Sequence, residues 1–179
     1  MEDWIMKILK TLVFAGVAAL ALAAATPKAH AIDVGVNAGV YIPAGDAKDD
    51  YKLGYGIKGH VGFDIFPMFD ARVFAGYYQA DGDGNNFELS STNGGVMLVF
   101  SPPIPVVKPY VGLGYAVHRT KYGPNGSQDD YGHGVVAEAG VNMSILIAEL
   151  GLYANYMQNE VGDLDLGGWT AGLNASIGF

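Results

Sequence analysis

The sequence predicts an all-β fold: an eight-stranded antiparallel up-and-down transmembrane β-barrel, preceded by a cleaved signal peptide. Three observations support this prediction. After Ile32, apolar and polar residues alternate with a period of two in segment after segment, and no long helical period occurs. The chain has 26 glycines and 12% aromatic residues, a composition typical of strands joined by many turns. An apolar run with basic flanks opens the chain.

The overall composition excludes several classes of protein. Half of the residues are hydrophobic and 16% are charged, whereas a disordered chain is poor in apolar residues and rich in charge. The net charge of -8 argues against a nucleic-acid-binding protein, which would show a basic surface. The chain has no cysteine, which excludes disulfides, thiolate metal sites and cysteine nucleophiles.

Residues 1–31 are predicted to be a secretory signal peptide. Lys7 and Lys10 precede the apolar run Thr11–Ala25, and Ala29-His30-Ala31 gives a small-x-small cleavage pattern. The run is shorter than the roughly 20 residues that a membrane-spanning helix needs, so cleavage is favoured over an N-terminal membrane anchor. The predicted domains are therefore the signal peptide, residues 1–31, and the barrel, residues 32–179.

Seven of the eight alternating segments have a regular apolar face without charged residues. The fourth segment, residues 87–100, is less regular, because Leu89 and Leu98 differ in parity. We predict that a β-bulge at Gly94-Gly95 switches its faces. Taking every second residue, the regular apolar faces run from Ile32 to Ile42, Tyr51 to Ile65, Ala71 to Tyr77, Val107 to Val117, Val135 to Ile145, Leu150 to Tyr156 and Trp169 to Phe179.

The connections between these segments alternate in character. Those at residues 43–50, 81–86, 123–131 and 159–167 are long, polar and acidic, whereas those at 66–68, 101–105 and 146–147 are short and nearly uncharged. With an even number of strands, all long loops then lie at one end of the barrel and all short turns at the other. Transmembrane β-barrels show this asymmetry.

The two faces of the strands favour a membrane barrel over a soluble barrel with an apolar core. The polar faces are dominated by glycine rather than by long charged side chains, which a crowded interior favours and a water-facing surface does not. Aromatic residues of the apolar faces gather at both strand ends, as expected for two water–lipid interfaces. They are Tyr51, Tyr55, Tyr77, Tyr115, Tyr156 and Trp169 toward the long loops, and Phe63, Phe69, Phe100 and Phe179 toward the short turns.

The last segment, Gly168–Phe179, alternates to a terminal phenylalanine. With the signal peptide and the eight strands, it resembles the small outer-membrane β-barrel proteins of Gram-negative bacteria, the porin-family or OmpA/OmpX-like superfamily, over the whole of residues 32–179. The resemblance implies an outer-membrane location and a monomer surrounded by outer-membrane lipids and lipopolysaccharide. It also implies handling by periplasmic chaperones and by the outer-membrane assembly machinery, which would read Trp169, Leu173, Ile177 and Phe179 as an assembly signal.

A barrel of eight strands is only wide enough to be filled by its own side chains. Charges on its inner face must then be paired, because an unpaired buried charge is costly. We expect a lumen network in which Lys58 lies beside Glu138 and Arg72 meets Asp64, Asp70 or Glu149. Its members are Lys58, His60, Arg72, Glu138 and Glu149. A satisfied structural network is the favoured interpretation, and a gated narrow conduit is the alternative.

The acidic loops are interpreted as soluble loops, with divalent cations bound beside lipopolysaccharide phosphates as the alternative. The segment Asp81–Asn86 resembles the start of a Ca²⁺-binding loop. However, Asn86 and Thr92 occupy the positions where such a loop needs glycine and glutamate. We therefore predict a turn, and we expect no metal and no cofactor.

The sequence gives little support for catalysis. His60 and His118 belong to inner faces and His133 to a loop edge, and no nucleophile, base and orienting acid can be assembled around them. We therefore predict a non-enzymatic outer-membrane protein with a structural or surface-interaction role through short acidic extracellular loops. The alternatives are a narrow-lumen porin or transporter for small or hydrophobic molecules and, less favoured, a lipid A-modifying enzyme.

Overall fold

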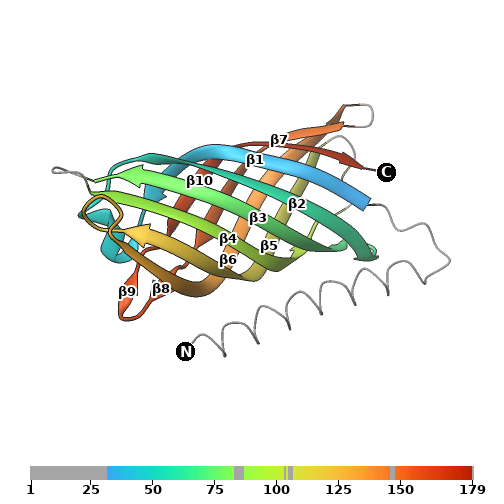
Figure 1. Ribbon diagram of the computed structural model, residues 1–179. Helices are drawn as coiled ribbons and strands as arrows, with labels where there is room; N and C mark the ends of the chain where they lie inside the picture. The colour runs from blue at the N-terminus through green and yellow to red at the C-terminus, as the bar shows by residue number, and fades with distance from the viewer. Residues whose placement is uncertain (1–31, 83–86, 103, 105–106, 146–147, 179) are drawn as a thin grey trace. The chain divides into compact units, whose positions relative to one another are not determined.

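A computed structural model describes residues 32–82, 87–102, 104, 107–145 and 148–178. The predicted signal peptide, Asp83–Asn86 and Phe179 lie outside these ranges. Eight long antiparallel strands form a closed barrel (Figure 1). They are β1 (Ile32–Pro43), β2 (Gly54–Phe66), β3 (Phe69–Asp81), β4 (Glu88–Phe100), β5 (Val107–Tyr122), β6 (Gln128–Ile145), β7 (Ala148–Met157) and β10 (Gly168–Gly178).

The barrel has the up-and-down order that the sequence predicts. Each long strand pairs with its neighbours along the chain, and β1 pairs with β10 from Asp33–Gly178 to Pro43–Gly168, which closes the sheet. The other pairings are equally regular, apart from one shift in register between Asp64 and Phe66 of β2. Closure leaves no free edge along the middle of the wall, which a strand in hydrocarbon requires.

The strands turn their apolar faces outward. Leu152 and Leu173 are 65% and 67% exposed, whereas Lys58 and Glu138 are only 6% and 4% exposed. A soluble barrel would show the opposite arrangement, since burial of apolar groups drives its folding. The exposed apolar wall therefore fits a hydrocarbon environment, and the predicted orientation of the faces is confirmed.

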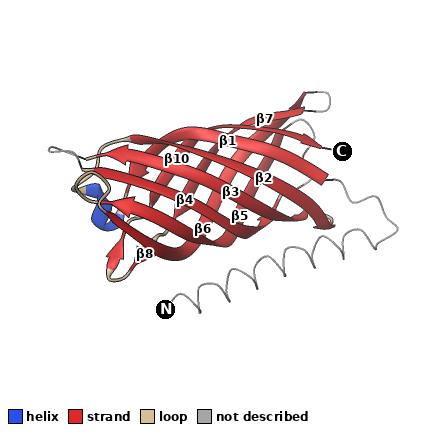
Figure 2. Cartoon of the chain, in the orientation of Figure 1, coloured by secondary structure: helices blue, strands red, loops and turns tan. Residues whose placement is uncertain are grey.

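Helices contribute little to this fold. Among the described residues, the one helical segment is the 3-10 helix η1 (Gly45–Lys48), in the connection between β1 and β2 (Figure 2). Within the described ranges, no helix has the length and apolar character needed to cross a membrane.

Aromatic side chains lie outward at both ends of the wall. Tyr115 and Trp169 are exposed toward the long loops, while Phe69 and Phe100 pack together toward the short turns with ring centroids 5.2 Å apart. The prediction that Tyr51 faces the lipid interface is wrong. This residue precedes β2 and is buried inside, only 8% exposed. Its hydroxyl accepts a hydrogen bond from a loop amide instead of facing a lipid interface.

The predicted bulge at Gly94-Gly95 is also wrong. β4 pairs with β3 and β5 without a shift in register, and burial alternates regularly along it. Leu89 therefore points into the barrel and is fully buried. The two glycines carry no side chain that reveals the parity, and an apolar residue inside the lumen near the long loops has the same sequence signal as one on an outward face.

Two predicted connections contain strands. β5 runs to Tyr122 and β6 starts at Gln128, so residues 123–131 are not all loop. This hairpin is polar on both faces, which hides the alternation of its strands. The 159–167 connection holds a small hairpin of β8 (Glu160–Val161) and β9 (Leu164–Asp165), turned at Gly162 with φ of +62°.

Candidate functional site

A buried group of charges surrounds Glu138 of β6 near the middle of the lumen. The upper lumen is the part toward the long loops, and the lower lumen is the part toward the short turns. Lys58 of β2 donates a hydrogen bond from its Nζ to Glu138 Oε2, and Asn37 Nδ2 lies 3.5 Å from the same oxygen. Arg72 of β3 has its Nη1 3.9 Å from Glu138 Oε1 and its Nη2 3.9 Å from Asp70 Oδ2. Two cations and a carboxylate thus meet across the barrel interior.

Aromatic rings complete this level of the lumen. The Lys58 ammonium lies 5.3 Å from the centroid of Phe74, and the Arg72 guanidinium lies 5.2 Å from the centroid of Tyr110. Both are cation–π geometries, which partly offset the desolvation of the cations. The rings and the long charged side chains are all buried at this level of the lumen.

The other two residues predicted for the network lie elsewhere. His60 Nε2 is 3.0 Å from Asp33 Oδ2 on the neighbouring strand β1. Glu149 does not meet Arg72. It accepts hydrogen bonds from Lys108 and Asn142 near the short turns. Asp33 and Lys108 were not predicted as partners in the lumen, although their inward parity near a strand end indicates this position.

A second polar group fills the upper lumen. Thr120 Oγ1 donates to Ser91 Oγ at 3.0 Å, and Ser91 Oγ lies 3.4 Å from His118 Nδ1. A hydroxyl within hydrogen-bond distance of an imidazole is the arrangement of a nucleophile and its general base. Both side chains are fully buried, however, and among the described residues no carboxylate contacts His118. Ser91 and His118 therefore lack both substrate access and an orienting acid.

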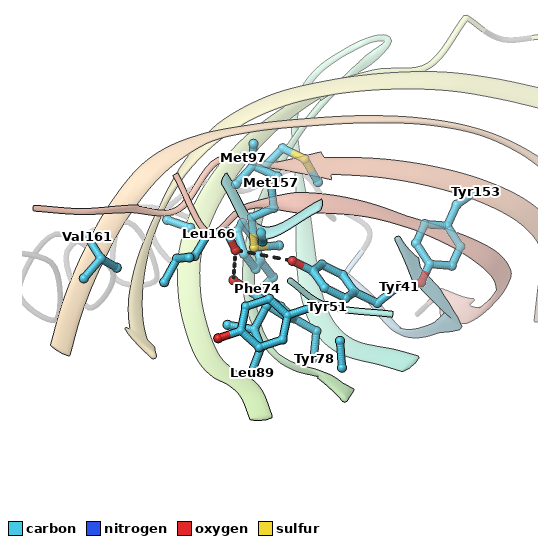
Figure 3. Packing of buried hydrophobic residues seen from close by; sticks show 14 of the residues in the cluster. Tyr41, Tyr51, Phe74, Tyr78, Leu89, Met97, Tyr153, Met157, Val161 and Leu166 are labelled. Carbon is cyan, nitrogen blue, oxygen red and sulfur yellow. Dashed lines mark hydrogen bonds between the residues drawn. The ribbon is translucent and has the colours of Figure 1, made fainter. Parts of the chain in front are cut away.

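The long loop after β7 packs across the mouth of the barrel, where its residues Asn159, Val161 and Leu166 are buried and its Glu160 pairs with His133 of β6. We call this segment, Gln158–Gly167, the lid. Tyr41 OH donates to the carbonyls of Gly167 and Leu166 at 3.0 and 3.3 Å, and Tyr78 OH donates to Leu166 O at 3.3 Å (Figure 3). The rings of Tyr41 and Tyr78 stack with centroids 4.4 Å apart.

Asn159 anchors the lid from within. Its Nδ2 donates to Tyr78 OH and to Thr120 Oγ1, both at 2.8 Å, and the residue is fully buried. Gly132 of β6 makes room for it, since a Cβ there would collide with Asn159 and Val161. Asp46 of η1 accepts a hydrogen bond from the Asp165 amide at 2.8 Å. The first and last long loops therefore interlock above the lumen.

The rim around the lid is acidic. Among the described residues its carboxylates belong to Asp46, Asp49, Asp50, Asp81, Glu88, Asp129, Asp130, Glu160, Asp163 and Asp165. Its basic residues are Lys48, Lys52, Arg119 and Lys121. The remainder of the segment that resembles a Ca²⁺-binding loop, Asp83–Asn86, lies outside the described residues.

One ion pair on the rim has a defined geometry. Arg119 Nε and Nη2 lie 3.1 and 2.8 Å from the two carboxylate oxygens of Asp129. Both residues lie beyond Tyr115 of the aromatic belt, on the part of the β5–β6 hairpin outside the membrane. The hydrogen bonds from Arg119 hold the pKa of Asp129 below its usual value.

Replacing Arg119 by alanine is expected to return the pKa of Asp129 toward that of a free aspartate, about 3.9. The Arg119–Asp129 pair stabilises the folded state above that pKa, and its contribution is lost as the pH falls through the lowered value. An NMR titration of the Asp129 carboxyl carbon in micelles measures the shift. Lys121→Ala is the matched control with a smaller effect, because Lys121 acts only through its charge. An Asp129 titration curve unchanged by Arg119→Ala would contradict the assignment.

The barrel is similar to solved outer-membrane proteins. The chain matches Neisserial surface protein A (16% identity, TM-score 0.58) over 85% of this chain and 98% of that one. It matches OprG from Pseudomonas aeruginosa (14%, TM-score 0.65) over 85% and 97%. It matches Ail, the attachment invasion locus protein of Yersinia pestis (15%, TM-score 0.52), over 84% and 99%. The likenesses show a shared fold.

A search of curated protein sequences found no significant match. The profile of one family, the outer membrane protein beta-barrel domain, matches residues 11–176, which is most of the chain. The eight closed strands, the apolar outer wall and the polar lumen are what that family implies. The chain is therefore a member of the outer membrane protein β-barrel domain family and is located in the outer membrane of Gram-negative bacteria.

Proposed function

We propose that this protein is a closed, non-enzymatic outer-membrane barrel that acts at the cell surface through its acidic extracellular rim. The contacts that the lid and the group around Glu138 make across the lumen are the observation that carries this proposal. The lid occupies the mouth, and the group around Glu138 fills the lumen below it. A barrel obstructed at two levels is suited to display a surface rather than to pass solutes.

The charge of the rim points to the chemistry of the partner. The related Ail was solved with the heparin analogue sucrose octasulfate, which is a polyanion. The rim described above has more than twice as many carboxylates as basic residues, which opposes binding of a polyanion. A cationic surface on a peptide or protein is the complementary partner.

Binding to immobilised polylysine and to heparin tests this proposal. The refolded protein in micelles is expected to bind polylysine and not heparin, and to lose the binding as salt is raised, because rim charges are screened. Asp49→Asn, Asp50→Asn and Asp163→Asn together should weaken the binding. Lys48→Gln and Lys52→Gln should not. Preference for heparin, or equal binding by the Asn variants, would refute a cationic partner.

Transport of small molecules is a second candidate function. Several buried polar atoms of the lumen have no protein partner, which is a feature of hydrated passages. Planar-bilayer recordings separate the two candidates. We expect the wild-type protein to show no resolved conductance, and a reproducible channel would support the transporter instead of our proposal.

A lipid A-modifying enzyme is tested separately. Ser91→Ala should leave the lipid A of an expressing strain unchanged, and a change in the acyl pattern of that lipid A would support the enzyme.

The route to the membrane is also a proposal. Trp169, Leu173 and Ile177 point outward on β10, where the assembly machinery would meet them as an assembly signal completed by Phe179. Residues 1–31 would be removed on the way as a signal peptide. N-terminal sequencing of the protein from outer membranes is expected to start at Ile32.

A further inference from the structure

A small cavity lies inside the barrel between the lid and the charged group. It measures about 20 Å³ for the space open to the centre of a water molecule. Its lining includes Tyr78 above, Lys58 below, and Asn93, Tyr153 and Asn155 on the walls. A water needs roughly 10–15 Å³ on this measure, so the cavity has room for about one water.

Two amides of this cavity have unpaired polar atoms. Asn155 of β7 is 2% exposed, and neither its Oδ1 nor its Nδ2 has a protein partner. Asn93 of β4 is also buried and its Oδ1 has no partner. Buried amides are nearly always hydrogen-bonded, because an unsatisfied one carries its full desolvation cost. Their donors and acceptors, together with the Lys58 ammonium nearby, offer the partners that a buried water needs.

The lid contacts the lining of this cavity through a shared residue. Tyr78 lines the cavity, and its hydroxyl donates to Leu166 of the lid and accepts from Asn159. Any movement of the lid away from the mouth therefore breaks the hydrogen bonds of the residue above the cavity. On the other side, the contact between Lys58 and Glu138 separates the cavity from the lower lumen.

We propose that the cavity is an internal hydration site, in which Asn93 and Asn155 bind an ordered water whose exchange with the outside is controlled by the lid. The site shares the lid with the proposed surface role, but its test measures the lumen alone and can fail while the surface role stands. It also gives the unpaired amides a role that does not require a solute pathway.

Water-selective NMR of the isotope-labelled protein in micelles tests the hydration site. The side-chain amide protons of Asn155 should show a cross-peak to water with the sign of a slowly exchanging molecule. Asn37 is the matched control, because it is an equally buried inner asparagine whose Nδ2 and Oδ1 are bonded to Glu138 and Asn174. It should show no such cross-peak. A missing signal at Asn155, or one of equal strength at Asn37, would overturn the proposal.

The role of the lid is measured in the same way. Asn159→Ala removes both inner anchors of the lid while the backbone contacts to Tyr41 and Tyr78 remain. The exchange of the bound water should become faster on the order of tenfold, as two net hydrogen bonds allow. Asp163→Ala, at the exposed tip of the lid, should leave it unchanged. Equal exchange in wild type and Asn159→Ala would show that the lid does not control access.

Discussion

Replacing Glu138 by leucine is expected to destabilise the folded barrel by about 3–5 kcal/mol. Glu138 is the carboxylate that Lys58 and Arg72 share inside the lumen. Its removal leaves two buried cations with reduced compensation, and the cost of an uncompensated buried charge exceeds the value of the ion pair itself. Urea unfolding in lipid vesicles, followed by Trp169 fluorescence and by heat-modifiable gel mobility, measures the change.

The double variant Lys58→Met with Glu138→Leu is the control. It replaces the buried pair by apolar groups of similar size, which is often close to neutral, so most of the lost stability should return. Arg72 keeps Asp70 as a partner in both proteins. If Glu138→Leu alone stays within about 1 kcal/mol of the wild type, where solvent-exposed ion pairs lie, then water reaches Lys58 and Arg72. The lumen would then be open, and the proposed closure would be wrong.

The outline of this fold is predictable because its signal is local. Alternation of Val34, Val36 and Ala38 with their neighbours fixes one strand and its outward face without knowledge of any other strand. Repeating this along the chain gives the number of strands, and an even number with short turns at one end gives the up-and-down order. The hydrocarbon outside requires the closure of the sheet.

The errors arise where the local signal is ambiguous. Gly94 and Gly95 interrupt the pattern of β4, and Leu89 and Tyr51 are apolar yet lie inside. An apolar side chain at the mouth can pack against other loops as well as against lipid, and Tyr51 contacts Phe87 and the Gly123 amide. The positions of the loops, such as the lid that contacts Tyr41, depend on long-range contacts that no periodicity encodes.

The lumen could be predicted only in part for the same reason. Inward parity and height on the strand bring Lys58 and Glu138 to one level, and β2 and β6 stand opposite each other in the ring of strands. Parity does not tell which acceptor a long side chain reaches. Glu149 meets Lys108 rather than Arg72, because Lys108 extends inward from β5 at the same short-turn end.

Leu152→Arg is expected to cost about 2–4 kcal/mol, the range for a basic residue on the lipid face near the bilayer midplane. Leu152 lies outward, halfway along β7, beside Val141 and Leu173 of the neighbouring strands. An arginine there cannot reach water without distorting the bilayer. The free energy of unfolding in vesicles of defined thickness measures the effect.

Tyr55→Arg provides the matched comparison, because Tyr55 is also exposed and outward but lies in the aromatic belt. Its cost should be about 0–1 kcal/mol, since a charge near the interface remains hydrated. The difference between the two sites is the informative quantity. A barrel surrounded by water would tolerate arginine equally at both, as exposed surface substitutions do. Equal stability of the two variants would therefore contradict a lipid-facing wall, and with it the orientation on which the interior location of Glu138 and the lid depends.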